Sequence, residues 1–383
     1  MTVGKVEEII KVIVKTLSET HADLSDIQLL PDSVPYIRGF ISNKIDVNAF
    51  VPLSLNNNIS IKEEELKDFL YSHISDAQSQ LLTKERQISF RLEIKNEDGS
   101  TLAIFRATAY YQRDKLSLAL RFLKTNILTP SELHVHPIVY TNYMKNNAGL
   151  IIVSGPVGSG KTTTAVSLLK DKLISSKNRG ALHLVTIEAP VEYEINVAPD
   201  EGIVEQREVG VDTPDFFTAT RDIVRINPNI IFVGEVRDPE TAINCIQMAT
   251  TGHLVLTTFH SDSVKDTIAR FRSFLRTKED ISMFANALVA VTNQRLFTFK
   301  TLDGFKVFPI METVKVAATS RGSDAIKPLI IEDRISEIPN YINIENESVT
   351  TDACLNYIKK LIDQEEQLEI VRKPPNPPVS TDF

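Results

Sequence analysis

A glycine-rich segment in the middle of the chain has the residue types and spacing of a phosphate-binding loop (P-loop). It follows the apolar run 150–153 and precedes a helix-forming run, 163–172. The pattern G-x-x-x-x-G-K-T at such a junction lets backbone N–H groups and a helix N-terminus surround phosphate oxygens. The expected nucleotide-binding residues are therefore Gly155, Pro156, Val157, Gly158, Ser159, Gly160, Lys161, Thr162 and Thr163.

Two side chains of the P-loop have chemistry of their own. The ammonium group of Lys161 would reach the β- and γ-phosphates and take part in catalysis, and the Thr162 hydroxyl would be a ligand of Mg²⁺. ATP and Mg²⁺ are therefore the expected cofactors. A chance glycine loop is the alternative, and the strand and helix on either side count against it.

Two glutamates end apolar runs that are typical of buried strands. Glu235 follows the run 229–234, and Glu188 follows the run 182–187. Sites in open α/β sheets lie at the carboxyl ends of strands, so we expect both carboxylates in one catalytic cleft. Glu235 should lie beside the P-loop strand, where it would bind Mg²⁺ through water or polarise the attacking water. The alternative for Glu235 is a surface carboxylate at a strand end.

Histidines and arginines complete the set of candidate site residues. His253 and His260 flank one apolar strand, and we expect this pair to sense phosphate or to act as a structural switch, with a purely structural role as the alternative. In multimeric ATPases, an arginine from a neighbouring subunit stabilises the charge that develops on the transferred phosphoryl group. Surface salt bridges are the alternative role for the three arginines near Glu235, which are Arg221, Arg225 and Arg237.

The elements around these residues alternate between strand and helix from about residue 149 onward. Such alternation predicts a parallel sheet with helices on both faces. Residues 264–300 and 351–370 are also expected to be helical. The expected strands are 150–154, 182–187, 230–234 and 253–258, and the helices between them are 162–173, 213–225 and 239–250.

The first third of the chain has a different pattern and predicts an α+β domain. Apolar residues at helical spacing predict an amphipathic helix over 5–18. We expect its apolar face to pack on its own domain, with a membrane-surface helix as the alternative. The remaining elements expected here are helices near 62–72 and 76–82 and strands at 25–30, 36–38, 88–94, 102–111 and 116–123.

These patterns divide the chain of 383 residues into an N-terminal domain over 1–124, a linker over 125–148, a P-loop domain over 149–371 and a disordered tail over 372–383.

The net charge of −8 does not indicate a general nucleic-acid binder. The two cysteines indicate a reducing compartment. We find neither a signal peptide nor an apolar run of the ~20 residues that span a bilayer, and we expect a cytoplasmic protein.

Taken together, the motifs resemble one family, the ATPases of type II secretion, type IV pili and type IV secretion. The resemblance is strong from about residue 145 to 300 and weaker from 25 to 140. In family order the matching segments are the P-loop at 155–162, an aspartate box at 186–193, a loop at 206–210, an arginine-rich helix with the Walker B strand at 221–238, a histidine box at 251–260 and a Gln-Arg-Leu segment at 293–296, expected on a helix.

The resemblance implies a PAS-like N-terminal domain followed by a RecA-like P-loop domain, assembled in a ring that is usually a homohexamer. ATP would lie between the two domains, and Arg106 and Arg121 of the N-terminal domain would close onto the nucleotide. By the same resemblance, Glu235 would be the Walker B carboxylate and Glu188 the second acidic residue. His253 would couple the phosphate state to the position of the domains.

This sequence departs from the family pattern in three respects. Ala189 stands where the aspartate box usually has its aspartate, which leaves Glu188 as the acid of that pair. Asn227-Pro228-Asn229 replaces the usual Asp-Pro-Asp before the Walker B strand. The tetracysteine zinc motif of many assembly and type II secretion members is missing. The last departure favours the retraction branch or the type IVB secretion and conjugation branch.

The function that the resemblance implies is a Mg²⁺-dependent ATPase motor of a bacterial secretion, conjugation or pilus-retraction machine. It would work at the cytoplasmic face of the inner membrane, associated with the membrane through inner-membrane components of that machine. No direct binding to nucleic acid is expected. The alternatives are a nucleotide-gated assembly adaptor with little hydrolysis, a nucleic-acid motor and a P-loop kinase.

Overall fold

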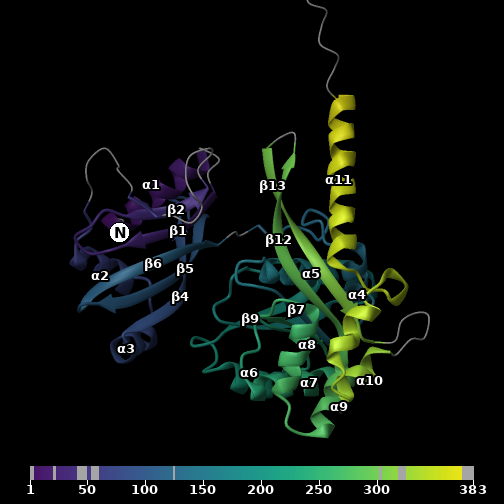
Figure 1. Cartoon of the computed structure of the whole chain (residues 1–383). Coiled ribbons are helices and arrows are strands. Elements are labelled where there is room, and N and C mark those ends of the chain that lie inside the picture. The colour runs from purple at the N-terminus through teal and green to yellow at the C-terminus, as the bar shows by residue number, and fades with distance from the viewer. Residues whose placement is uncertain are drawn as a thin grey trace, which may run out of the picture. The chain divides into compact units, whose positions relative to one another are not determined.

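The computed structural model describes residues 4–19, 23–40, 50–52, 60–123, 126–301, 304–317 and 325–372. The chain forms two units, whose elements are labelled in Figure 1. The first unit is Met1–Ile127 together with the short segments Ala189–Glu194 and Glu208–Asp212, and the second contains the rest. The domain limits expected from the sequence stay predictions, and the expected tail lies outside the described residues from 373 onward.

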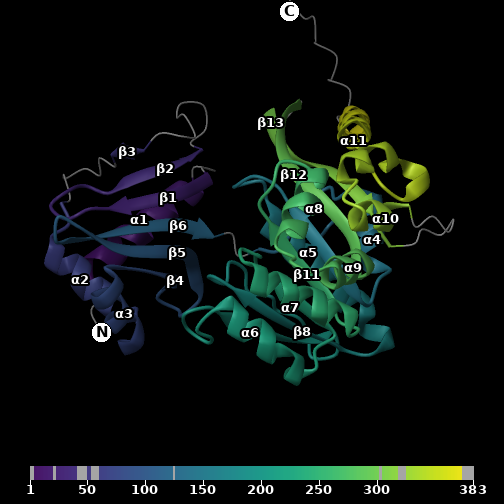
Figure 2. The ribbon, with the colours of Figure 1, turned by 60° about the horizontal axis from the view of Figure 1, so that its bottom comes forward.

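The first unit is built on a six-stranded antiparallel sheet with the strand order β3-β2-β1-β6-β5-β4 (Figure 2). Burial alternates along β4, where Ile88, Phe90, Leu92 and Ile94 point into the core, because successive side chains of a strand face opposite sides. The strands are β1 (Asp23–Leu29), β2 (Tyr36–Phe40), β3 (Val51–Pro52), β4 (Gln87–Lys95), β5 (Thr101–Gln112) and β6 (Lys115–Leu123).

Three helices complete the first unit: α1 (Lys5–Glu19), α2 (Glu63–Tyr71) and α3 (Asp76–Glu85). The apolar face of α1, which includes Val6, Ile10 and Ile13, is buried in the same core as the sheet residues. This confirms that the helix packs on its own domain. Within the described residues, no helix of the protein is long and apolar enough to cross a membrane.

The second unit is built on a seven-stranded sheet with the order β13-β12-β7-β11-β10-β8-β9. The run from β12 through β7, β11 and β10 to β8 is parallel, and β13 is antiparallel to β12. Every residue of β7, β10 and β11 is buried, as expected for parallel strands covered on both faces. The strands are β7 (Gly149–Ser154), β8 (Leu182–Glu188), β9 (Gly202–Glu208), β10 (Ile230–Val233), β11 (Leu254–Phe259), β12 (Leu288–Thr301) and β13 (Gly304–Lys315).

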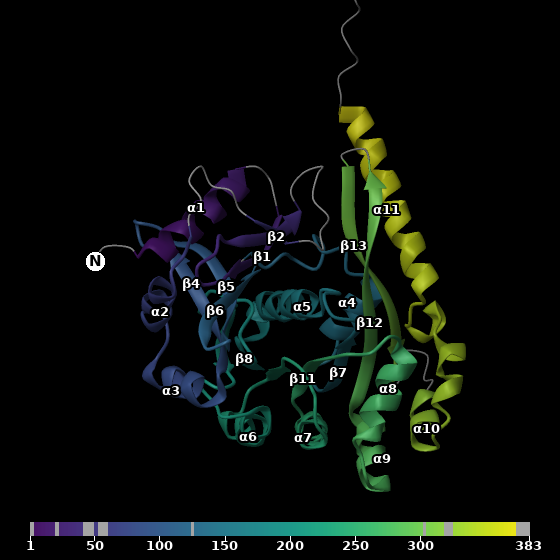
Figure 3. The same cartoon turned by 60° about the vertical axis from the view of Figure 1, so that its left-hand side comes forward.

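Helices cover both faces of this sheet. Figure 3 shows α4 (Pro137–Met144) and α5 (Lys161–Ser176) on one face and α6 (Phe216–Asp222) and α7 (Pro239–Thr250) on the other. The sequence-based prediction of an α/β protein, with an α+β domain followed by a P-loop domain, is therefore confirmed. The remaining helices are η1 (Lys177–Arg179), η2 (Ile223–Ile226), α8 (Val264–Ser273), α9 (Lys278–Ala287), α10 (Ile326–Ile331), η3 (Ile335–Tyr341), η4 (Ile344–Asn346) and α11 (Thr351–Arg372).

One stretch was predicted wrongly. Residues 264–300 were expected to be helical throughout, but helix α9 ends at Ala287 and residues 288–301 form strand β12. The segment Asn293–Leu296, expected on a helix, therefore lies in the sheet. The run Leu288-Val289-Ala290-Val291-Thr292 is rich in β-branched residues and lies between β7 and β13, a position that a strand can occupy and a helix cannot.

Candidate active site

The backbone of the P-loop needs its glycines. Gly158 and Gly160 have φ angles of +76° and +79°, in the left-handed region that favours glycine. At Gly155, an added Cβ would lie 2.2 Å from the carbonyl oxygen of Gln294, so a larger residue would push the loop away from β12. The loop ends at Gly160, the N-cap of α5. The unpaired N–H groups of the first turn of α5 therefore follow the loop directly.

The Lys161 side chain folds back over the loop. It is only 7% exposed, and its ammonium group donates hydrogen bonds to the carbonyl oxygens of Gly155, at 3.0 Å, and Pro156, at 2.9 Å. Its nitrogen also lies 3.5 Å from Nδ1 of His260. The ammonium group is thus held at the mouth of the loop by neutral carbonyl oxygens, the kind of contact that a phosphate oxygen outcompetes.

Glu235 and His260 meet beside Lys161. Glu235 follows β10 and pairs with the guanidinium group of Arg237, and its Oε2 lies 3.8 Å from Nε2 of His260. The His260 ring therefore lies between a cation and a carboxylate. Burial and the nearby Lys161 ammonium group lower the pKa of His260. The Lys161 and Glu235 side chains are both within reach of this one ring.

The sequence suggested that the strand before Glu235 lies directly beside the P-loop strand. In the structure the two strands are not neighbours. Strand β11 lies between β7 and β10. Glu235 still reaches the site because the backbone beyond β10 continues past the carboxyl end of β11, where Val236 N–H donates to the Thr258 carbonyl oxygen at 3.3 Å. His260, two residues after Thr258, then bridges the remaining gap to Lys161.

Glu188 is buried at the end of β8, with a residue exposure of 2%. Its Oε1 accepts hydrogen bonds from the Thr186 hydroxyl at 2.6 Å and from the Gln206 side-chain amide at 3.2 Å. Strands β8 and β10 are paired, and a Cβ at Gly234 would lie 3.5 Å from the Glu188 side chain. Glu188 therefore ends the strand next to β10, the strand that Glu235 follows.

Gln294 is a site residue whose role the sequence did not indicate. The side chain is 1% exposed, donates from Nε2 to the Ser159 carbonyl oxygen at 2.6 Å and accepts from the Thr164 hydroxyl at 2.9 Å. It thereby joins β12 to both the P-loop and helix α5. The available signal was a polar pair, Asn293-Gln294, within an otherwise apolar and β-branched run.

The other member of that pair supports the end of the P-loop strand. Asn293 donates from Nδ2 to the Ser154 hydroxyl at 3.1 Å and to the Ser261 carbonyl oxygen at 3.0 Å. The Thr267 hydroxyl donates to Ser154 at 2.7 Å. A buried polar network that is satisfied in this way fixes the relative positions of the residues around it, here the ends of β7 and β11.

The donor set at this edge of the sheet fits Mg²⁺ in a nucleotide complex. Mg²⁺ usually keeps several waters and takes one or two protein oxygens together with phosphate oxygens. Thr162 and Thr163 lie in the first turn of α5, and Glu235 lies at the carboxyl edge of the same sheet. Within the described ranges, no cluster of three or more His, Cys, Asp or Glu residues could hold a metal by itself.

The arginines expected at the nucleotide have different partners and surroundings in the structure. Arg237 pairs with Glu235 and is 64% exposed. Arg221 and Arg225 lie on the surface of α6 and η2, where Arg221 pairs with Asp222 at 3.0 Å. In the first unit, Arg106 donates to the Ala189 carbonyl oxygen at 3.1 Å, and Arg121 pairs with Asp26 at 3.1 Å.

His253 lies at the amino ends of the parallel strands, whereas the P-loop lies at their carboxyl ends. It precedes β11, and its carbonyl oxygen accepts a hydrogen bond from the Gly149 N–H at the start of β7, whereas the P-loop follows the end of β7. Its Nδ1 lies 3.0 Å from the Met248 carbonyl oxygen and 3.3 Å from the Thr251 hydroxyl. The structure therefore brings His260, not His253, to Lys161.

Comparison with known proteins matches most of the chain to one family. A family model described as "Type II/IV secretion system protein" matches residues 116–353. The type IV pilus retraction ATPase PilT of Pseudomonas aeruginosa is 31% identical over 323 residues, which cover 82% of this chain and 88% of that protein. A twitching motility protein of Neisseria gonorrhoeae is 30% identical over 72% of this chain and 69% of its own length.

Solved structures give the same result at the level of the fold. The crystal structure of the pilus retraction motor PilT with bound ADP has a TM-score of 0.73 and 30% identity, and the match covers 96% of this chain and 97% of that one. The ATPase DotB of Legionella pneumophila has a TM-score of 0.72 at 18% identity, with 96% of each chain covered.

Proposed function

The chain belongs to the type II/IV secretion system protein family, a family of P-loop ATPases, and on that premise we propose that it is a Mg²⁺-dependent ATPase motor. The similarity to PilT, a pilus retraction motor, supports retraction as its task, and passage of a substrate through a type IV secretion or conjugation machine is the related alternative. The observation that supports hydrolysis most is the meeting of Lys161, His260 and Glu235 beside the P-loop.

The proposed chemistry is in-line attack of water on the γ-phosphate. The Lys161 ammonium group exchanges its two carbonyl contacts for β- and γ-phosphate oxygens and stabilises the charge that develops on them. Thr162 and Glu235 would hold Mg²⁺, which neutralises phosphate charge when it is bound. Glu235 also orients the attacking water, and the buried Glu188 keeps its neighbour strand in place through Thr186 and Gln206.

The proposed assembly is a homohexameric ring at the cytoplasmic face of the inner membrane, held there by inner-membrane components of the machine. The exposed guanidinium groups of Arg221, Arg225 and Arg237 are suited to reach a nucleotide on a neighbouring subunit. We also propose that Arg106 and Arg121 close onto the nucleotide. Release of that closure after hydrolysis would convert the reaction into rigid-body motion.

The test is ATP hydrolysis by the variant Glu235→Gln. It removes the charge but keeps the size of the side chain, so we expect kcat to fall about 10²-fold or more while ATP binding persists. The control Glu240→Gln changes an exposed glutamate in the first turn of α7 and should hydrolyse ATP normally. Hydrolysis by Glu235→Gln at the unmodified rate would contradict the role given to this carboxylate.

A further inference from the structure

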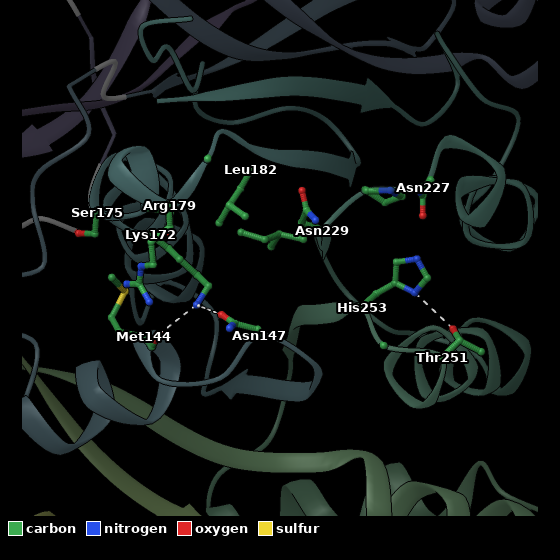
Figure 4. Close-up of a pocket in the computed structure, with 15 residues that line it drawn as sticks. Met144, Asn147, Lys172, Ser175, Arg179, Leu182, Asn227, Asn229, Thr251 and His253 are labelled. Carbon is green, nitrogen blue, oxygen red and sulfur yellow. Dashed lines mark hydrogen bonds between the residues drawn. The ribbon is translucent and has the colours of Figure 1, made fainter. Parts of the chain in front are cut away.

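A polar cavity lies at the amino ends of the parallel strands, whereas the P-loop lies at their carboxyl ends. It has a volume of about 420 Å³ and is bordered by the residues that precede β8, β10 and β11 and by the carboxyl end of α5. Figure 4 shows three basic side chains around it, Lys172, Arg179 and His253, together with three asparagines, Asn147, Asn227 and Asn229. Among the described residues that line the cavity, none is an aspartate or a glutamate.

Lys172 is a buried cation whose partners in the described structure are neutral. The residue is 3% exposed. Its ammonium group donates to the carbonyl oxygens of Met144, at 3.1 Å, and Asn146, at 2.8 Å, and lies 3.4 Å from Oδ1 of Asn147. Burial, and secondly the positive charge of Arg179, lower the pKa of Lys172 to about 8. These contacts satisfy its N–H groups but leave the positive charge unbalanced.

His253 adds a group that changes from acceptor to donor on protonation. The Met248 carbonyl oxygen can only accept, so the Nδ1 atom that lies 3.0 Å from it carries the hydrogen. The Nε2 atom of the same ring is then the site that gains a proton. Figure 4 shows the ring beside Asn227 and Thr251. In its imidazolium form this ring donates from both nitrogens.

The asparagines supply neutral donors where a carboxylate would repel an anion. The Asn229 side-chain oxygen accepts a hydrogen bond from the His183 N–H at 2.8 Å, so its amide N–H groups are the ones left to serve the cavity. Asn227 has a φ of +54°, in the left-handed region that Asn adopts readily.

We infer that this cavity binds a small anion that carries a phosphate group. Its size is within the range of small-molecule sites. Its lining combines the ammonium group of Lys172, the guanidinium group of Arg179, an imidazole ring and amide donors, and charge-assisted hydrogen bonds from such cations are the strong ones for phosphate. The cavity lies at the amino ends of the parallel strands and the P-loop at their carboxyl ends. The inferred anion binding is therefore independent of the proposed hydrolysis.

The experiment is a calorimetric titration of the full chain with its P-loop saturated by Mg²⁺ and ADP. One series uses inorganic phosphate and the other glycerol 3-phosphate, at matched ionic strength, and the tighter of the two shows whether free phosphate or a phosphate ester is preferred. We expect saturable binding of at least one. The variant Asn229→Asp should weaken it at least about tenfold, because it adds a negative charge and keeps the acceptor for His183.

Two further variants separate binding from folding. Lys172→Met removes the buried charge but also the contacts to Met144 and Asn146, whereas Arg179→Gln changes an exposed side chain. Both should weaken binding, and Lys177→Met, an exposed lysine of η1 that pairs with Asp200, should not. Failure of both anions to bind saturably, or equal binding by Asn229→Asp and the unmodified chain, would overturn the inference.

Discussion

At the scale of single residues, the candidate site depends on which histidine reaches the P-loop. Two histidines flank strand β11, and the family resemblance assigned the coupling role to His253. The structure places His260 within 3.5 Å of the Lys161 ammonium group and His253 at the far edge of the sheet. Parallel strands present their sites at their carboxyl ends, and that rule alone would have favoured His260.

Gln294 gives the first prediction at this scale. Replacing it by leucine, in Gln294→Leu, leaves the Ser159 carbonyl oxygen and the Thr164 hydroxyl without this buried partner, a cost of about 1–3 kcal/mol that falls on the P-loop. We expect the Kd for ADP to rise about tenfold, measured with a fluorescent ADP analogue. Gln247→Leu, at an exposed position of α7, is the control. Unchanged affinity in Gln294→Leu would show that the loop keeps its shape without this side chain.

Lys172 gives a prediction for pH. Its pKa in the folded protein is about 8, below the ordinary value of 10.5, so between these values the unfolded chain binds more protons than the folded one. Stability must then rise with pH across this window, because the cost of burying the charge disappears. We expect the unmodified chain to gain stability relative to Lys172→Met as the pH rises from 8 to 10, measured by thermal unfolding. A constant difference would contradict the assignment.

At the scale of elements, the sequence predicted those whose periodicity is strong and local. The helix α1 and strand β4 agree with the expectation because their apolar residues recur at one period, and strands β5 and β6 agree because they are apolar runs bounded by turn residues. Strand β12 was mistaken for helix because it follows helix α9 directly and no turn residue separates the two, and the pair Asp303-Gly304, a typical hairpin signal, was overlooked. Its place in the sheet is decided by contacts with β7, more than a hundred residues earlier in the chain.

The packing of α1 can be tested by a pair of variants on the same helix. Ile10 is fully buried in the core of the first unit, so Ile10→Ala should lower the free energy of unfolding of that unit by about 2–5 kcal/mol. Val12 is exposed, and Val12→Ala should change it by less than about 0.5 kcal/mol. Urea unfolding measures both. Equal effects of the two variants would mean that α1 does not contribute its apolar face to the core.

At the scale of the whole molecule, the sequence predicted an α+β domain followed by a P-loop domain, and both are present. The P-loop pattern predicts the strand before it and the helix after it, and the alternation of strands and helices that follows predicts a parallel sheet. Residues 301–350 were left unassigned, and within them the short helices α10, η3 and η4 are too brief for a periodic signal. Neither the ring nor the machine it serves can be derived from one chain, since both depend on surfaces of other molecules.

The most direct test of the central claim is Mg²⁺-dependent ATP hydrolysis measured as a function of protein concentration. A ring in which a neighbour completes the site predicts that activity per subunit rises with concentration and then reaches a plateau, in parallel with the mass measured in solution. Omission of Mg²⁺ should abolish it. Absence of ATP turnover at every concentration, with the assembled ring present, would contradict the motor and favour a nucleotide-gated adaptor instead.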